Sequence, residues 1–205
     1  MRDIDHALSD IAGIRAQLAS STRFHGFAPA AIAGSGAFAF LAAMAQTLWP
    51  ERLSNDPARY VAVWVSVAVA SAALILVEGL ARVGRMHGAM ASTMVVGTAR
   101  QMAPFGVAGA GITLILYDSA PGSMWILPGL WQILIALIGF TSLANLPRAI
   151  AWPAGWYFVC GLAVLKLACG GAPLSPWMMG LPFSLGQAAV ALILHRDTER
   201  RHARF

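Results

Sequence analysis

The sequence predicts an all-α membrane protein, a polytopic bundle of six transmembrane helices preceded by a short amphipathic helix. Composition predicts the membrane setting, because 58% of the 205 residues are hydrophobic, only 11% are charged and the mean hydropathy is +0.66, unlike a soluble domain of this length. The spacing of charges predicts the helices, because charged residues separate six uncharged stretches. Each stretch holds close to the ~20 apolar residues that a helix needs to cross the hydrocarbon core.

The arginines predict how these helices are oriented. In a six-span topology most arginines fall on one side, and they are Arg2, Arg15, Arg23, Arg82, Arg85, Arg100, Arg148, Arg196, Arg200, Arg201 and Arg204. Only Arg52 and Arg59 fall on the other side. This bias is typical of the cytoplasmic face, so we expect both termini in the cytoplasm. The net charge of +5 is therefore expected to meet anionic lipid headgroups, not nucleic acid.

Residues 1–23 form the first predicted region, a cytoplasmic amphipathic helix. Its apolar residues recur at helical spacing, and they are Ile4, Leu8, Ile11, Ile14 and Leu18. This stripe can lie on the membrane surface, pack under the bundle or bind a partner helix. Packing under the bundle is the simplest of the three, and a partner would contact Ile4, Leu8, Ile11 and Leu18. No apolar stretch precedes Arg23, so we expect no removable signal peptide.

Residues 24–195 form the predicted bundle. The six spans are predicted at 27–49, 60–81, 101–117, 124–144, 149–170 and 176–195. A run of Ala, Gly and Ser from residue 28 to residue 45 predicts a close-packing face on the first span, and Gly106, Gly109 and Gly111 predict a similar face on the third. Residues 196–205 follow as a basic cytoplasmic tail.

The two hairpins 101–144 and 149–195 show signs of an internal repeat. The stretch from Ala120 to Trp125, APGSMW, is similar to the stretch from Ala172 to Trp177, APLSPW. Leu-Pro, a glutamine and Ala-Leu-Ile follow each copy. Each copy predicts an external turn, with serine as the helix cap and tryptophan at the membrane interface. A gene duplication explains this pattern, and so do two similar solutions to the same turn problem.

The repeated glutamines, Gln132 and Gln187, are candidate ligand or pathway residues. The repeat predicts that they lie at matching depth inside the membrane. Two amides that converge in a bundle can hold a polar ligand group. They can equally hydrogen-bond to each other and join the helices, worth only ~1 kcal/mol, and we favour this second interpretation.

Few ionisable residues fall inside the predicted spans, and we expect them to form ion pairs. Glu78 precedes Arg82 by one helical turn, in the favourable order for an interfacial pair. Lys166 is the only lysine and lies near the external end of its span. A buried lysine can anchor a substrate or form a Schiff base. Snorkelling to the interface and pairing with Asp118 is the preferred interpretation.

The cytoplasmic stretch 82–100 contains a weak candidate for a metal site. Met86, His87, Met90 and Met94 stand at helical spacing, and their soft ligands suit Cu(I). A methionine stripe is more often plain packing, so we expect no metal.

No cofactor or catalytic site is predicted. His25 and His195 lie too close to the cytoplasmic boundary for the paired axial ligands of haem. The chain has neither a GxxxxGK[ST] nor an HExxH pattern. Ser35 lies between two glycines, as in some membrane serine proteases, but without a deep histidine base it is better explained by close packing. Cys160 and Cys169 fall on opposite faces of one helix, so we expect free thiols.

Several stretches resemble a known group of proteins. They are residues 127–134 (LPGLWQIL), residues 174–183 (LSPWMMGLPF) with Gln187, and residues 14–18 (IRAQL) leading to Phe24 and Phe27. These stretches resemble a group of small uncharacterised bacterial integral membrane proteins with six helices. The resemblance implies a bacterial inner membrane and carries no established activity, hence no functional residue.

The sequence therefore favours a non-catalytic inner-membrane protein, a sensory, regulatory or accessory module. It is expected to bind an apolar or amphiphilic molecule in the bundle and a protein partner through its cytoplasmic elements. The alternative is a small secondary transporter or permease, and the third possibility is a membrane-embedded enzyme. Composition and spacing predict no oligomeric state.

Overall fold

The computed structural model of the protein describes residues 29–85, 89–144 and 146–202, with side chains outside 82–99 and 201–202. The described residues contain helices and no strand. The α-helices are α2 (Pro29–Leu48), α3 (Pro50–Leu53), α4 (Pro57–Arg85), α5 (Ala89–Ser119), α6 (Leu127–Thr141), α7 (Ala151–Cys169) and α8 (Trp177–His202). Three short 3-10 helices accompany them, η1 (Pro121–Ile126), η2 (Ser142–Ala144) and η3 (Arg148–Ile150).

Six helical segments are long and apolar enough to cross a membrane, which confirms the predicted helical bundle. They are Pro29–Leu48, Pro57–Ala81, Arg100–Ser119, Pro121–Ala144, Arg148–Cys169 and Trp177–Arg200. Each overlaps one predicted span. The boundaries differ most around the predicted extramembrane stretch 82–100, because α4 continues to Arg85 and α5 already begins at Ala89. The amphipathic helix predicted within residues 1–23 lies outside the described residues.

Local sequence explains where the helices begin and end. Proline is the first residue of α2, α3, α4 and η1, where its missing N–H costs no helical hydrogen bond. Asp56 supports the start of α4, since its Oδ1 accepts from the N–H of Ala58 at 2.9 Å. After α7 the chain turns at Gly171, whose φ of 81° suits glycine.

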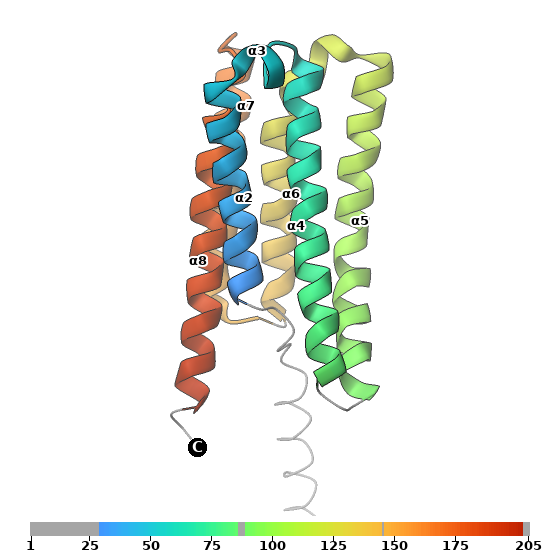
Figure 1. Cartoon of the computed structure of the whole chain (residues 1–205), viewed down its shortest axis with the longest axis vertical. Coiled ribbons are helices and arrows are strands. Elements are labelled where there is room, and N and C mark those ends of the chain that lie inside the picture. Colours follow the sequence, from blue (N-terminus) through green and yellow to red (C-terminus); the bar gives the residue numbers. More distant parts are fainter. Residues whose placement is uncertain (1–28, 86–88, 145, 203–205) are drawn as a thin grey trace, which may run out of the picture.

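The six long helices form a ring in chain order, which α2 and α8 close (Figure 1). Neighbours in the ring are α2 and α4, α4 and α5, α5 and α6, α6 and α7, α7 and α8, and α8 and α2. We call the end of the bundle that carries α3 the α3 end, and the opposite end, where α8 finishes, the tail end (Figure 1). At the α3 end η1 contacts α4, α5, α6 and α7, so it joins four helices of the ring there.

Small residues bring two pairs of helices closest together, α2 with α8 and α6 with α7. A Cβ built on Gly129 of α6 would lie 2.7 Å from the carbonyl oxygen of Gly161 on α7. A Cβ on Gly36 of α2 would lie 3.0 Å from the Cβ of Gln187 on α8. In a membrane such close backbone approach supplies the packing that burial from water supplies elsewhere. The predicted close-packing face of the first span is thus confirmed.

The two serine turns of the proposed repeat differ. The Ser175 Oγ accepts from the N–H of Trp177 at 3.3 Å, so Ser175 caps α8 as predicted. Ser123 lies inside η1, which has no side-chain cap, so the predicted cap at Ser123 is wrong. The first copy winds into a 3-10 helix directly at Pro121, whereas the second stays irregular until Trp177.

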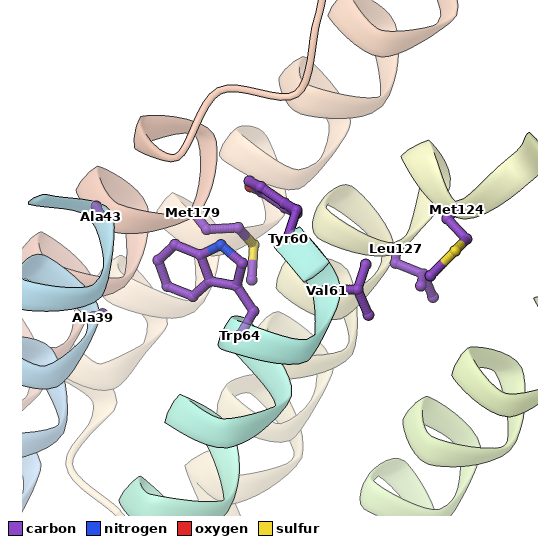
Figure 2. Packing of buried hydrophobic residues seen from close by; sticks show 8 residues of the cluster. All are labelled: Ala39, Ala43, Tyr60, Val61, Trp64, Met124, Leu127 and Met179. Carbon is purple, nitrogen blue, oxygen red and sulfur yellow. The ribbon is translucent and has the colours of Figure 1, made fainter. Parts of the chain in front are cut away.

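The main buried cluster lies toward the α3 end, where α2, α4, α6, η1 and α8 meet (Figure 2). Its members are Ala39, Ala43, Tyr60, Val61, Trp64, Met124, Leu127 and Met179. A smaller cluster near the tail end joins Ile32 of α2 and Ile150 of η3 with Ala191 and Leu194 of α8. The larger cluster surrounds the polar groups described below.

Candidate functional site

Pro182 interrupts the backbone hydrogen bonding of α8, and the Gln132 side chain supplies the missing donor. Proline has no N–H, so the carbonyl four residues earlier, that of Met178, lacks its helical donor. The Nε2 of Gln132, on α6, donates to this carbonyl at 2.9 Å. The Gln132 side chain is fully buried. One predicted glutamine therefore joins two helices, but its partner is the backbone of α8 and not the other glutamine.

Three further side chains donate to carbonyls on either side of Met178. The Tyr60 hydroxyl, from α4, donates to Ser175 O at 3.1 Å. From α7, Trp156 Nε1 donates to Pro182 O at 3.1 Å and the Tyr157 hydroxyl to Phe183 O at 3.4 Å. The segment of α8 around Pro182 is thereby held from α6 and α7, and the residues just before α8 are held from α4.

Two buried polar atoms near Met179 have no hydrogen-bond partner in the described structure. One is the Nε1 of Trp64, a donor, and the other is the Oε1 of Gln132, an acceptor. The side chains of Trp64 and Gln132 are 3% and 0% exposed. Leaving such a group unpaired costs about 1–3 kcal/mol, and in hydrocarbon no bulk water compensates. Few buried polar groups remain unpaired in native structures, so these two call for an explanation.

Met179 lies near both side chains, and its contact with Gln132 is made by the amide nitrogen and not by the unpartnered oxygen. Gln132 Nε2 lies 3.6 Å from the Met179 sulfur, a weak acceptor. Trp64 packs in the same buried cluster as Met179, and both project into the space between α4 and α8 (Figure 2). The Tyr60 hydroxyl lies near the Trp64 indole but does not reach hydrogen-bonding geometry with its Nε1. We call Trp64, Gln132 and Met179, with the neighbouring rings of Tyr60 and Phe183, the Met179 site.

Aromatic rings and a thioether line the Met179 site, and none of its five side chains carries a charge at neutral pH. The Trp64 ring lies 6.3 Å from the Tyr60 ring and 6.5 Å from the Phe183 ring, measured between centroids. Methionine is the most adaptable of the apolar side chains, with three rotatable bonds. An apolar lining with a few aimed polar groups is the usual composition of a small-molecule site.

Gln46 of α2 carries a third unpartnered atom, its Oε1. Its Nε2 donates to Leu53 O at 3.1 Å and to Tyr60 O at 3.4 Å. Gln46 therefore ties α2 to α3 and to the first turn of α4, and it is fully buried. We assign it to the α3 end of the bundle and not to the Met179 site.

Gln187, the second predicted ligand residue, lies elsewhere. It follows Met178 by nine residues on α8, which is about 13 Å along a helix. Its Cβ faces Gly36 at the contact of α2 with α8. The predicted meeting of the two amides is thus not found, because α8 begins its helix at Trp177 and brings Met178, not Gln187, to the depth of Gln132.

The predicted ion pair between Lys166 and Asp118 is not formed. Both residues are exposed, and the structure records no contact within 4.0 Å between their charged groups. Asp118 ends α5 and accepts from the Ser119 hydroxyl at 3.4 Å. Lys166 lies in the last turn of α7, where a cation suits the helix dipole. The reason is the ring order, since α5 and α7 each pack against α6 and not extensively against each other.

Other predicted residues lie wholly or partly outside the described side chains. Glu78 is described and half-buried, but the side chain of its expected partner Arg82 is not. The metal candidates Met86, His87, Met90 and Met94 and the stripe of Ile4, Leu8, Ile11 and Leu18 also lie outside the described side chains. These expectations stay predictions.

The remaining candidate residues are His195, Ser35 and the two cysteines. His195 faces Glu199 one turn later, with Nε2 and Oε1 3.3 Å apart, and both are exposed. The Ser35 hydroxyl donates to Ile32 O at 2.7 Å within its own helix. Cys160 and Cys169 are free thiols, as predicted. Within ranges 29–85, 89–144 and 146–202, no three His, Cys, Asp or Glu residues gather as metal ligands.

Sequence analysis missed Trp64, Met179 and Gln46. Tryptophans were interpreted as interface residues, yet Trp64 follows Tyr60 by one turn on the buried face of α4. One signal was available for Met178 and its neighbour Met179. A proline inside a span frees the carbonyl four residues earlier, and a buried amide elsewhere is the natural donor.

Fold and composition define a multi-pass helical membrane protein, and the buried side-chain atoms without a partner among the described residues belong to Gln46, Trp64 and Gln132. Comparison of the chain with models of protein families, with curated proteins and with solved structures finds no match.

Proposed function

We propose that the protein is a non-catalytic module of the bacterial inner membrane, sensory, regulatory or accessory in role, which binds an amphiphilic molecule at the Met179 site and a protein partner on the cytoplasmic side. The observation that carries this proposal is the pair of fully buried, unpartnered atoms, Trp64 Nε1 and Gln132 Oε1, around Met179. An unpartnered donor and an unpartnered acceptor in otherwise apolar surroundings favour a ligand that carries a polar group.

The shape of the bundle supports binding from within the membrane. At the α3 end η1 joins four helices of the ring. By contrast, α5 is loosely attached. Only 6% of the most apolar part of its span Arg100–Ser119 is buried, against 39% for the span of α2. An amphiphile dissolved in the bilayer reaches the bundle from the side. The contact between α4 and α5 is the smallest contact between neighbouring helices of the ring, so entry is expected there.

The tail end supports the cytoplasmic part of the proposal. Arg148, Arg196 and Arg200 are exposed there, at the ends of η3 and α8. The smaller buried cluster joins these two elements, so the three arginines belong to one end of the bundle. Basic residues favour the cytoplasmic side of a membrane and contact with anionic headgroups.

The proposal is tested by native mass spectrometry of the protein released from its own membrane in lipid nanodiscs. We expect an amphiphile of defined mass to stay bound to the wild type and to Gln187→Leu, and to be lost from Trp64→Phe. Gln187→Leu is the matched control, because it changes an intramembrane residue away from the Met179 site. A wild type that carries no amphiphile, or equal retention by all three proteins, would refute amphiphile binding at this site.

The partner half of the proposal needs its own experiment. Deletion of residues 1–20 together with residues 196–205 is expected to remove the copurifying protein while the bundle still folds. If every copurifying protein and every phenotype survives the deletion, the cytoplasmic elements do not engage a partner.

A small secondary transporter is the second candidate. Pro182 favours it, because α8 carries an interrupted backbone whose carbonyls accept hydrogen bonds from side chains of two other helices, α6 and α7. Interrupted helices form the substrate sites of many transporters. The variant with both Gln132→Leu and Gln187→Leu is expected to lose solute flux, and a folded double variant with normal flux would remove this candidate.

A further inference from the structure

The half of α5 nearer the α3 end is firmly held by its neighbours. Its Ile112 and Leu116 pack against the main buried cluster. Thr113 adds a hydrogen bond to α6, because its Oγ1 accepts from Trp131 Nε1 at 3.2 Å. Gly109 is buried, and a Cβ built on it would lie 3.4 Å from a leucine of α6. Packing and hydrogen bonding together fix this half of α5 in the ring.

The half of α5 nearer the tail end is held much less. Side chains are described there from Arg100 onward, and of residues 100–108 three are half-buried and six are exposed. The described hydrogen bond from this half to α6 is exposed and runs from Gln101 Nε2 to Thr141 O at 3.0 Å. A Cβ built on Gly106 would meet no described atom within 4 Å. This half would therefore lose few described contacts if it moved away from α6.

Between the two halves, the sequence weakens the α5 helix itself. Pro104 has no N–H, so the carbonyl of Arg100 lacks its helical donor. Gly106 and Gly109 follow, and glycine inside a helix is less stable than alanine. The Thr113 hydroxyl donates to Gly109 O at 2.6 Å, a kind of bond that often bends helices. Proline, glycine and such side-chain bonds are the usual causes of helix bending, so α5 bends most easily at residues 104–109.

We propose that residues 89–103, the tail-end part of α5, form a gate that swings away from α4 and α6 about a hinge at residues 104–109. The hydrogen bond from Gln101 to Thr141 closes the gate. This inference rests on the proposed function, for which it supplies the path of an amphiphile from the bilayer into the ring. The path opens between α4 and α5, and the α3-end half of α5 keeps its contacts with η1 and α6.

The experiment measures distances between two spin labels by pulsed electron paramagnetic resonance in lipid nanodiscs. The gate pair joins Arg100→Cys on α5 to Trp152→Cys on α7, both exposed positions, with Cys160 and Cys169 replaced by alanine. Arg100 lies about 9 Å along the helix from Gly106, so a swing moves its label by several ångströms. We expect two distances, or one broad distribution, for this pair.

A matched control pair reports on the half of α5 that stays in place. It joins Tyr117→Cys to the native Cys169 of α7, both exposed, with Cys160 replaced by alanine. We expect one narrow distribution of distances. A narrow distribution for the gate pair as well, or equal breadth for the two pairs, would overturn the proposal.

The hinge is tested by stiffening it. Pro104→Ala combined with Gly106→Ala restores an N–H and a better helix former, and both positions are exposed. We expect the fraction of the longer distance in the gate pair to fall about fivefold. Gly155→Ala on α7, where an added Cβ also meets no described atom, is the control and should leave this fraction unchanged. An unchanged fraction in the stiffened protein would contradict the hinge.

The closing hydrogen bond is tested by Gln101→Leu. Because it removes one hydrogen bond from the closed arrangement, we expect the fraction of the longer distance to rise about fivefold. Gln187→Leu, which removes an amide at the contact of α2 with α8, is expected to leave the fraction unchanged. Equal effects of the two variants would contradict the role of Gln101.

The distances and the native mass spectra separate this inference from the proposed function. A rigid α5 in a protein that retains an amphiphile, and loses it in Trp64→Phe, would overturn the gate while the proposed function stands. A gate pair with two distances in a protein that carries no amphiphile would contradict the proposed function alone.

Discussion

The side of the ring formed by α2, α8, α7 and α6 is packed through small residues, whereas the side formed by α4 and α5 is not. Gly129 and Gly161 allow α6 and α7 to touch backbone to backbone. On α5, a methyl group added at Gly106 or Gly111 would have no neighbour within 4 Å, and only Gly109 meets α6, through Leu134 and Trp131. The presence of small residues therefore does not by itself bring a helix close to its neighbour, since Gly129 and Gly36 lie against another helix whereas Gly106 and Gly111 do not.

Side-chain hydrogen bonds follow the same division. Around Pro182 the α8 backbone receives donors from α6 and α7, and the segment just before α8 receives one from α4. Among the described side chains, bonds between α5 and α6 run from Gln101 Nε2 to Thr141 O at 3.0 Å and from Trp131 Nε1 to Thr113 Oγ1 at 3.2 Å. The Met179 site thus sits against a well-held helix, with the loosely held helix at the other side of the ring.

The largest effect is expected from overpacking the tight side. Gly129→Val would force a side chain against Leu165 and the Gly161 carbonyl, and backbone cannot move aside cheaply. We expect the free energy of unfolding to fall by about 3 kcal/mol, the upper part of the range for overpacked cores. Gly106→Val on α5 is the matched control, expected to change it by less than about 0.5 kcal/mol. Reversible unfolding in mixed micelles measures both, and equal losses would erase the contrast between the two sides.

The next largest loss of stability is expected when the Gln132 donor to the Met178 carbonyl is removed. Gln132→Leu leaves Met178 O without a donor, and we expect a loss of about 1–2 kcal/mol in the free energy of unfolding. In a Pro182→Ala background the restored N–H should reduce this loss by about 1 kcal/mol. The same unfolding assay, applied to the four proteins of the cycle, gives the coupling. Additive losses would show that the Gln132 amide does not serve the carbonyl freed by Pro182.

A smaller effect is expected at Tyr60. Tyr60→Phe removes the hydroxyl that donates to Ser175 O, but this carbonyl keeps a second donor, Met178 N, at 3.0 Å. We expect a loss of about 0.6 kcal/mol, the average for an interhelical hydrogen bond in a membrane. Tyr117→Phe, on an exposed tyrosine of α5, should have no measurable effect. A larger loss at Tyr117 than at Tyr60 would contradict the prediction that the start of α8 is held more firmly than α5.

The smallest effect is expected where α5 meets α6. Thr113→Val removes the hydroxyl that accepts from Trp131, a half-buried indole at the edge of the ring. We expect the free energy of unfolding to fall by less than about 0.5 kcal/mol. Exchange of the α5 amides should quicken while exchange in α6 and α7 stays the same, as measured by hydrogen exchange. Uniform quickening across the bundle would mean that α5 unfolds together with the other helices.

The sequence predicts the positions of the membrane-spanning helices, but it does not predict which face of each helix packs against its neighbours. Stretch lengths located all six spans, and the small residues of the first span correctly indicated close packing. The same argument did not distinguish Gly109 from Gly106 and Gly111. In soluble helices the polar face tells which side is outward, but helices that are apolar all round carry no such signal. The rotation of α5 is consequently not encoded in its pattern.

At the candidate site, too, the sequence predicts a buried polar residue but not its hydrogen-bond partner. The repeat selected Gln132 and Gln187 together, as two amides at matching depth in apolar runs. Gln132 is fully buried, but Gln187 is not its partner. The actual partner, Met178 O, depends on α8 starting at Trp177 and on Pro182 removing one N–H, and the second requirement alone is visible in the sequence.

By itself, the sequence determined the all-α class of the protein and the number of helical segments long and apolar enough to cross a membrane. It did so because crossing hydrocarbon demands a certain length of apolar chain, which is a local property. The tertiary structure decided that the ring closes between α2 and α8, that Lys166 and Asp118 stay apart, and that Trp64 and Gln132 flank Met179. Those outcomes depend on helix rotation and depth, which only packing between distant segments can set.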